Sequence, residues 1–309
     1  MEKRAAESRK RSMKKLILGS RGSRLAILQA ELAQKLLFER FPDLETEICI
    51  IATEGDIDRT SPLSSFGGRG AFVRSIESAL LKNEIDVAVH SLKDLPSRLP
   101  EGLALGAAPV REDPRDALIS SDGHTLADIP KGSIIATGSD RRRIQLEKIR
   151  PDLSFRNIRG NIETRIGKLG LAGIEGIVLA CAGIKRLGLE NHITQIFSTE
   201  ELLPAPCQGT LGLECRADDQ DVLHLLGLID NPEIRPCVDV ERTFIATLGM
   251  GCHAPVAALA SMEGEQITFT GLVAGKNGFI FRESRTVYYK EAEDAARSLA
   301  EKFRNSMEG

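Results

Sequence analysis

Tryptophan is absent from this chain, and only two of its 309 residues are tyrosine. Aromatic residues make up 4% of the sequence and hydrophobic residues 42%, so the cores must be built from aliphatic side chains. Proteins that bind single-stranded nucleic acid stack the bases on aromatic side chains, and a net charge of −3 lacks the basic excess of a general nucleic-acid binder. We therefore expect no nucleic-acid partner.

Paired cysteines and long apolar runs are missing as well. The six cysteines form no CxxC pair, and structural zinc sites usually take ligands at such short spacing. No segment approaches the roughly 20 consecutive apolar residues of a membrane span, and the basic N-terminus lacks the apolar core of a secretory signal. We expect reduced thiols, no metal, no membrane and a cytoplasmic protein. Residues 1–14 are expected to be a disordered tail, or a targeting remnant for an organelle stroma.

Short apolar runs alternate with amphipathic segments along the first two thirds of the chain. Leu25, Leu28, Leu32 and Leu36 recur at three-to-four spacing, which is typical of a helix, and a second helix is expected over 72–81. Such alternation predicts mainly parallel sheets covered by helices. Strands are expected at 15–20, 47–53, 85–90 and 103–108, and in a second unit at 133–136, 154–158 and 176–180.

The pattern changes after a breaker-rich link at 204–209. One further strand, LGLECR, is followed from about residue 231 by a helix over 238–248 and two β runs. Gly275, Lys276, Asn277 and Gly278 lie between these runs and predict a hairpin. The expected parts are a tail at 1–14, an α/β domain 1 at 15–112 with 208–229, an α/β domain 2 at 113–207, and a small α+β domain 3 at 230–309.

Cationic residues follow most of the predicted strands. Between Lys131 and Lys168 there are ten Lys or Arg and four Asp or Glu, although the whole chain is slightly acidic. The planar guanidinium binds carboxylates and phosphates in bidentate fashion, and ligands of parallel sheets lie beyond the carboxyl ends of the strands. A small polycarboxylate therefore fits this pattern, although any single arginine could equally lie on a solvated helix face. The polar and cationic residues at these ends are Arg21, Ser23, Ser91, Lys93, Thr137, Ser139, Arg141, Arg142, Arg159, Arg165 and Arg186.

Asp94 follows the strand at 85–90 and precedes Leu95-Pro96. A carboxylate beside Lys93 and several arginines stays ionised. It could stabilise a developing cation or move a proton, and it could equally cap the next turn.

Cys252 lies in the loop Gly249-Met250-Gly251-Cys252-His253, which predicts an exposed thiol or else a small buried hydrophobe. Cys207 also lies in a loop and is a candidate for a second reactive thiol. His124, His192 and His224 have no companions at metal-ligand spacing and are expected to be surface or structural residues. Gly67, Gly68 and Arg69 lack the full phosphate-loop pattern and are expected to form a lid over the site.

Five segments, in this order, resemble the porphobilinogen deaminase (hydroxymethylbilane synthase) family over nearly the whole chain from about Lys15. They are VAVHSLKDLP, REDPRDALIS, RNIRGNIETRIGKL, ACAGIKRLGL and LGMGCHAPVAA. The resemblance implies two periplasmic-binding-protein-like α/β domains hinged around a cleft, plus a small third domain.

The resemblance also implies the chemistry. A dipyrromethane cofactor would be held through a thioether to Cys252, Asp94 would be the catalytic residue, and the strand-end set would bind carboxylates. The transferase would condense four porphobilinogen molecules with loss of ammonia and release linear hydroxymethylbilane. The protein would act as a monomer in porphyrin and heme biosynthesis. Asp140, where an apolar residue is usual, and Ser65, where a Lys is common, depart from the family pattern.

Two alternatives use the same residues differently. A two-lobed anion-binding protein would need the arginines but would have no use for Cys252 or Asp94. A Cys–His hydrolase would use Cys252, although no histidine is placed in the sequence as its base.

Overall fold

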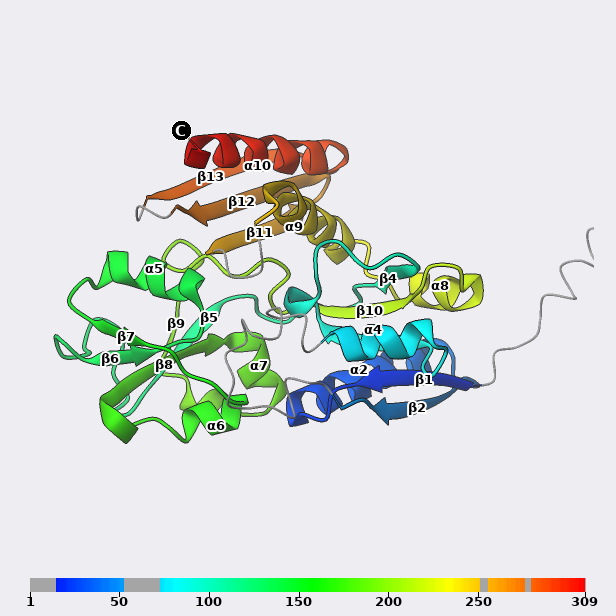
Figure 1. The fold of residues 1–309 in the computed structure, drawn as a ribbon, viewed down its shortest axis with the longest axis horizontal. Coiled ribbons are helices and arrows are strands. Elements are labelled where there is room, and N and C mark those ends of the chain that lie inside the picture. Colours follow the sequence, from blue (N-terminus) through cyan, green and yellow to red (C-terminus); the bar gives the residue numbers. More distant parts are fainter. Residues whose placement is uncertain (1–14, 53–72, 251–254, 276–278, 309) are drawn as a thin grey trace, which may run out of the picture.

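The computed structural model describes residues 15–52, 73–250, 255–275 and 279–308, and its elements are arranged in three units (Figure 1). The predictions for the tail, for Gly67, Gly68 and Arg69, and for Cys252 fall outside these residues. None of the described helices is long and apolar enough to cross a membrane.

The first unit is a five-stranded sheet with the order β2-β1-β3-β10-β4. β1 pairs in parallel with β2 and β3, whereas β10 runs antiparallel to both β3 and β4. Its strands are β1 (Lys15–Ser20), β2 (Glu45–Ile50), β3 (Val87–Ser91), β4 (Leu103–Ala107) and β10 (Leu211–Arg216).

The second unit repeats this plan with the order β7-β6-β8-β5-β9. β6 pairs in parallel with β7 and β8, and β5 runs antiparallel to both β8 and β9. Its strands are β5 (Asp116–Ser120), β6 (Ile134–Ala136), β7 (Ser154–Arg156), β8 (Ile174–Ala180) and β9 (Gln195–Ile196).

The chain crosses between the two units twice, once before β5 and once before β10. The crossing segments meet at an isolated antiparallel bridge between Arg111 and Thr210. Gly209 lies here with a φ of +87°, and a Cβ on it would meet the Glu112 carbonyl oxygen at 2.2 Å. Only glycine allows the two segments to approach this closely.

Helices cover both faces of each sheet, as the alternating side chains of the strands require. In the first unit α2 (Arg24–Arg40) and α8 (Gln220–Gly227) cover one face and α4 (Arg74–Leu81) covers the other. In the second unit α6 (Ile162–Ile166) and α7 (Cys181–Arg186) lie opposite α5 (Asp140–Ile149). The resulting cores are almost wholly aliphatic, as the composition predicts.

The helix expected from the leucine spacing is present as α2, but its buried face is different. Ala26, Ala30, Ala33 and Leu37 are buried, and the four leucines of the predicted stripe are only half-buried. Small alanines let the helix axis lie close to the sheet, and Leu25 is turned toward α7, where it approaches Gly183. Leu25 therefore faces the second unit, whereas Leu32 packs against the core of the first.

The third unit packs α9 (Ile234–Leu248) and α10 (Ala292–Glu308) on one face of a three-stranded antiparallel sheet (Figure 1). Its strands are β11 (Val256–Glu263), β12 (Gln266–Ala274) and β13 (Ile280–Tyr288). β12 and β13 pair antiparallel as the hairpin pattern predicts. Leu203 of the link before the second crossing packs on the other face.

The expected fold class is confirmed, with two corrections. Half of the strand pairings in each large sheet are antiparallel, because β10 and β5 enter after a crossing and run against their neighbours. Sequence periodicity also missed β5, β9 and β11. We propose the expected domain bounds, 15–112 with 208–229, 113–207 and 230–309, from this sheet membership.

Candidate functional site

The parallel strand β6 of the second unit is followed by short polar side chains. β6 runs directly into buried Thr137, whose hydroxyl accepts a hydrogen bond from the Ser139 backbone N–H at 3.3 Å. Ser139 is the residue before α5, so both hydroxyls lie at a helix N-terminus, where backbone N–H groups favour anions.

Arg141 and Arg142 lie on the first turn of α5 and are 5% and 6% exposed. Both bind Asp116, the first residue of β5, with nitrogen-to-oxygen distances of 2.8 Å. Arg141 also donates to the Leu203 carbonyl, and Arg142 donates to the Val178 carbonyl. Burial opposes ionisation of Asp116, but the two guanidinium groups hold its pKa well below the ordinary value.

The two arginines therefore do not lie free at the strand end as the sequence suggested. Asp116 fixes both of them, and one carboxylate against two guanidinium groups leaves a buried excess of positive charge. A role in carboxylate binding remains a proposal for this pair.

Arg165 on α6 and Arg186 at the end of α7 lie beyond the carboxyl ends of β7 and β8. Arg165 donates to the Gly160 carbonyl at 2.7 Å, and Arg186 donates to the Gly209 carbonyl at 2.7 Å. Burial, reinforced by repulsion from Arg142, lowers the pKa of Arg165 to about 10, and burial lowers that of Arg186. Arg159 is half-buried in the segment between β7 and α6.

In the first unit β3 ends in the 3-10 turn Leu92–Asp94. Ser91 is hydrogen-bonded to Gln29 of α2 at 2.8 Å. Burial lowers the pKa of Lys93 to about 8, with Arg142 and Arg141 also lowering it and Asp94 and Asp116 raising it. Lys93 is thus a cation that the protein holds in a poorly solvated place.

Arg21 and Ser23 follow β1. The Ser23 hydroxyl accepts a hydrogen bond from the Ala26 backbone N–H at 3.3 Å, so Ser23 is the N-cap of α2. Arg21 is half-buried beside it.

The structure brings residues of both units into one electrostatic cluster. Asp94 of the first unit raises the pKa of Arg165 in the second, and Arg142 of the second lowers the pKa of Lys93 in the first. Among the described residues of this cluster, Lys93, Arg141, Arg142 and Arg165 are positively charged, and Asp94 and Asp116 are negatively charged. This local excess of cations over carboxylates favours an anionic ligand.

Gln208 links the two units at the second crossing, and sequence reasoning missed it. Its amide nitrogen donates to Asp116 at 2.8 Å and to the Pro114 carbonyl at 2.7 Å. Its amide oxygen accepts from the Lys93 ammonium at 3.4 Å. The only hint in the sequence is a polar residue within the breaker-rich link, which does not reveal its partners.

Cys207 adjoins Gln208. It is 2% exposed, and burial raises its pKa, so the structure argues against the second reactive thiol that the sequence left open. Its backbone N–H donates to Glu241 of α9, and its φ of +58° lies in the left-handed region. Cys181, the first residue of α7, is buried as well.

Fold and site together define an α/β protein that gathers cations from both of its large sheet units around Asp94 and Asp116. The chain belongs to the porphobilinogen deaminase family. Residues 16–224 match the family model described as porphobilinogen deaminase, dipyromethane cofactor binding domain, and residues 236–305 match its C-terminal domain. The family is one of enzymes of tetrapyrrole synthesis.

Curated relatives carry the same name. The chain is 46% identical over 289 residues to the porphobilinogen deaminase of Syntrophomonas wolfei, covering 93% of this chain and 94% of that protein. It is 43% identical to the porphobilinogen deaminase of Syntrophus aciditrophicus, with 93% and 94% covered.

Solved structures with a similar fold include two binding proteins. The match to the methionine binding protein MetQ covers 71% of this chain and 90% of MetQ, with a TM-score of 0.45 and 14% identity. The match to a Salmonella typhimurium periplasmic binding protein with high arginine specificity covers 70% of this chain and 91% of that protein, with a TM-score of 0.40 and 14% identity.

Proposed function

We propose that this chain is a hydroxymethylbilane synthase, a transferase that condenses four porphobilinogen molecules with loss of ammonia. The growing chain would be held on a dipyrromethane cofactor linked to Cys252 and released as linear hydroxymethylbilane. Family membership supports this reaction, and one structural observation carries it further: Asp94 lies in a cluster where cations outnumber carboxylates.

The cation excess fits the charge of the substrate. Each porphobilinogen carries an acetate and a propionate, so every addition brings two carboxylates to the site. Lys93, Arg165 and Arg186 are cations whose pKa values are lowered by burial. A bound carboxylate would relieve that penalty and restore their ordinary ionisation. We assign them, with Arg21, Ser23, Ser91, Thr137, Ser139, Arg141, Arg142 and Arg159, to carboxylate binding.

The same donor set fits the cofactor, which bears carboxylates of the same kind. Arg165 and Lys93 would hold these groups from opposite units, and Thr137 and Ser139 would donate hydroxyl hydrogen bonds at the N-terminus of α5. When bound, the cofactor supplies the pyrrole carbon that is extended and keeps each addition effectively intramolecular.

Asp94 is proposed to act on the nitrogen end of the substrate. Loss of ammonia leaves a cation on the incoming pyrrole, and a carboxylate in a partly desolvated place stabilises such a charge more strongly than water does. Asp94 raises the pKa values of both Lys93 and Arg165, so it lies within electrostatic reach of both cations. The Asp94 carboxylate can also accept the proton released when the new bond forms.

The intact mass of the purified protein tests the proposal. Wild-type protein is expected to exceed its polypeptide mass by two porphobilinogens less two ammonias, and Cys252→Ala protein is expected to show no excess. Cys207→Ala is the matched control, because that thiol is buried and should not affect the added mass. A folded wild type without added mass after incubation with porphobilinogen would instead favour a two-lobed anion-binding protein.

We also propose a cytoplasmic monomer. The five described cysteines are free, as expected in a reducing compartment. The cation cluster is built from one chain, so no second copy is needed to complete it. Light scattering coupled to size-exclusion chromatography measures the oligomeric state directly.

A further inference from the structure

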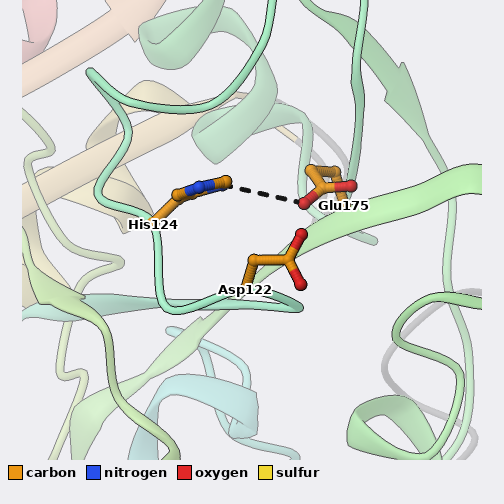
Figure 2. Close-up of side chains that lie close together, drawn as sticks. All are labelled: Asp122, His124 and Glu175. Atoms are coloured by element: carbon orange, nitrogen blue, oxygen red, sulfur yellow. Dashed lines mark ion pairs between the residues drawn. The ribbon is translucent and has the colours of Figure 1, made fainter.

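Three potential metal ligands meet at the edge of the second unit, away from the cation cluster. Asp122 and His124 lie in the turn after β5, and Glu175 lies at the start of β8. One donor atom from each residue lies within 4.8 Å of the other two. Figure 2 shows the His124 ring directed toward Glu175, with the Asp122 carboxylate beside them.

Backbone pairing fixes this meeting. The Ser121 N–H donates to the Glu175 carbonyl at 3.0 Å, which continues the antiparallel β5–β8 register beyond Ser120. The Ser121 hydroxyl donates to Glu175 Oε1 and orients that carboxylate. Gly123, with a φ of +76°, makes the turn that brings His124 back over the strand end.

The histidine supplies a second, independent observation. Its Nδ1 atom is screened from solvent and has no hydrogen-bond partner among the described residues. The nearest carboxylate oxygen is Glu175 Oε1, at 3.9 Å, which is too far for a hydrogen bond. A screened imidazole nitrogen without a partner, facing two carboxylates, has the chemistry of an unfilled metal ligand.

We propose that Asp122, His124 and Glu175 bind a divalent first-row transition ion, with Zn²⁺ as the reference probe. One imidazole and two carboxylates suit such an ion better than Mg²⁺, which prefers oxygen ligands and retains its water. Closing the ligands around an ion at about 2.0–2.2 Å needs side-chain shifts of roughly 1 Å.

The site is structural rather than catalytic. β8 spans seven residues, and Glu175 is near its amino end, whereas Arg186 lies beyond its carboxyl end. At about 3.3 Å per residue the two ends are some 15–20 Å apart. A bound ion would tie the turn after β5 to β8 without touching the cation cluster.

Isothermal titration of the full-length protein with ZnCl₂ tests the proposal. We expect one ion per chain. Loss of an outer-shell partner typically weakens metal binding ~10–100-fold. His124→Ala and Glu175→Gln remove a direct ligand and should weaken Zn²⁺ binding by more than that. His192→Ala, which removes an exposed histidine of the same unit, should bind as wild type does. Millimolar Mg²⁺ should not compete.

Cobalt gives a second reading that does not depend on heats of binding. Co²⁺ should produce visible absorption bands in wild type and His192→Ala that disappear in His124→Ala. Absence of Zn²⁺ binding in wild type would overturn the proposal. So would unchanged affinity in folded His124→Ala and Glu175→Gln protein, because the ion would then be held by other residues.

Discussion

Arg111 and Glu241 form a two-pronged ion pair, with nitrogen-to-oxygen distances of 2.7 and 3.2 Å. Arg111 belongs to the first crossing segment and Glu241 to α9 of the third unit. Glu241 also accepts hydrogen bonds from the backbone N–H groups of Cys207, in the second crossing, and Ala260, in β11. One carboxylate with 0% exposure thus joins the third unit to both crossings.

Glu241→Gln should lower the free energy of unfolding by about 3–5 kcal/mol, because it leaves the buried Arg111 charge uncompensated. Urea denaturation measures this loss. Glu233→Gln, at the exposed position just before the same helix, should stay within about 0.5 kcal/mol of wild type. An equal small effect in both variants would show that the carboxylate does not hold the crossings.

Asp94→Asn should keep the fold and lose nearly all turnover, because an amide neither stabilises a developing cation through charge nor accepts the released proton. Steady-state assays of product formation measure the effect, with denaturation curves as the check on folding. Asp218→Asn, an exposed aspartate of the same unit, serves as control. Substantial activity in Asp94→Asn would remove the carboxylate from the mechanism.

Arg142→Leu and Arg165→Leu should fail in different ways. Arg142 is buried against Asp116, so its loss should cost about 3–5 kcal/mol of stability and also impair cofactor assembly or elongation. Arg165 donates to a backbone carbonyl and has no ion pair with Asp116, so Arg165→Leu should impair ligand binding with a smaller loss of stability. Arg141→Leu should behave as Arg142→Leu does. Wild-type kinetics in all three would contradict the carboxylate-binding assignment.

The pKa of Lys93 predicts a pH limit on substrate binding. Burial lowers it to about 8, so Lys93 is protonated below that pH and loses its charge above it. Because a carboxylate binds the protonated form, porphobilinogen affinity should fall above about pH 8, by at most tenfold per pH unit. KM for porphobilinogen should therefore rise above about pH 8 in wild type and in the control variant Lys148→Met. A Lys93→Met variant that shows the same rise would assign it to another group.

Glu77 of α4 predicts a pH dependence of stability. Burial, together with repulsion from Glu214, raises its pKa, while His90 and Arg74 lower it. The native state therefore keeps a proton that the unfolded state has released, so stability falls as pH rises from about 4.5 through the raised pKa. Glu77→Gln should remove this fall and be more stable than wild type at about pH 8, while matching it near pH 4.5.

Urea denaturation at several pH values provides that comparison. Glu84→Gln, at an exposed position, should keep the wild-type dependence. The neighbouring pair, His90 Nε2 to Glu214 Oε2 at 2.9 Å, is unchanged in both variants. A Glu77→Gln protein with the wild-type pH profile would show that the carboxyl is not protonated in the native state.

Sequence periodicity predicted most of the long elements because their cores impose a regular pattern, although it missed the eight-residue β11. It failed for β5 and β9, since a strand that begins with Asp116 or spans two residues has no apolar alternation to detect. The leucine spacing also did not reveal that Ala26, Ala30, Ala33 and Leu37 form the buried face of α2, because leucine outweighs alanine in any hydrophobic count. Packing close to a sheet favours the smaller side chain.

The candidate site was predictable in part, through residues that follow parallel strands. Lys93, Asp94, Arg142 and Arg165 were named from that rule, and the structure brings them together. Asp116, Gln208 and Glu241 could not be found in this way, because each acts through partners that are distant in sequence. Glu175 escaped for the same reason, since metal-ligand spacing was sought only along the chain.

The double crossing has a mechanical consequence. If the two sheet units rotate against each other, displacement is smallest at the crossings and grows with distance from them. Glu241 binds both crossings, so the third unit lies beside the axis of such a rotation. The edge strands β2 and β7, three strands away from β10 and β5 at the crossings, would then move farthest, while the third unit stays in place.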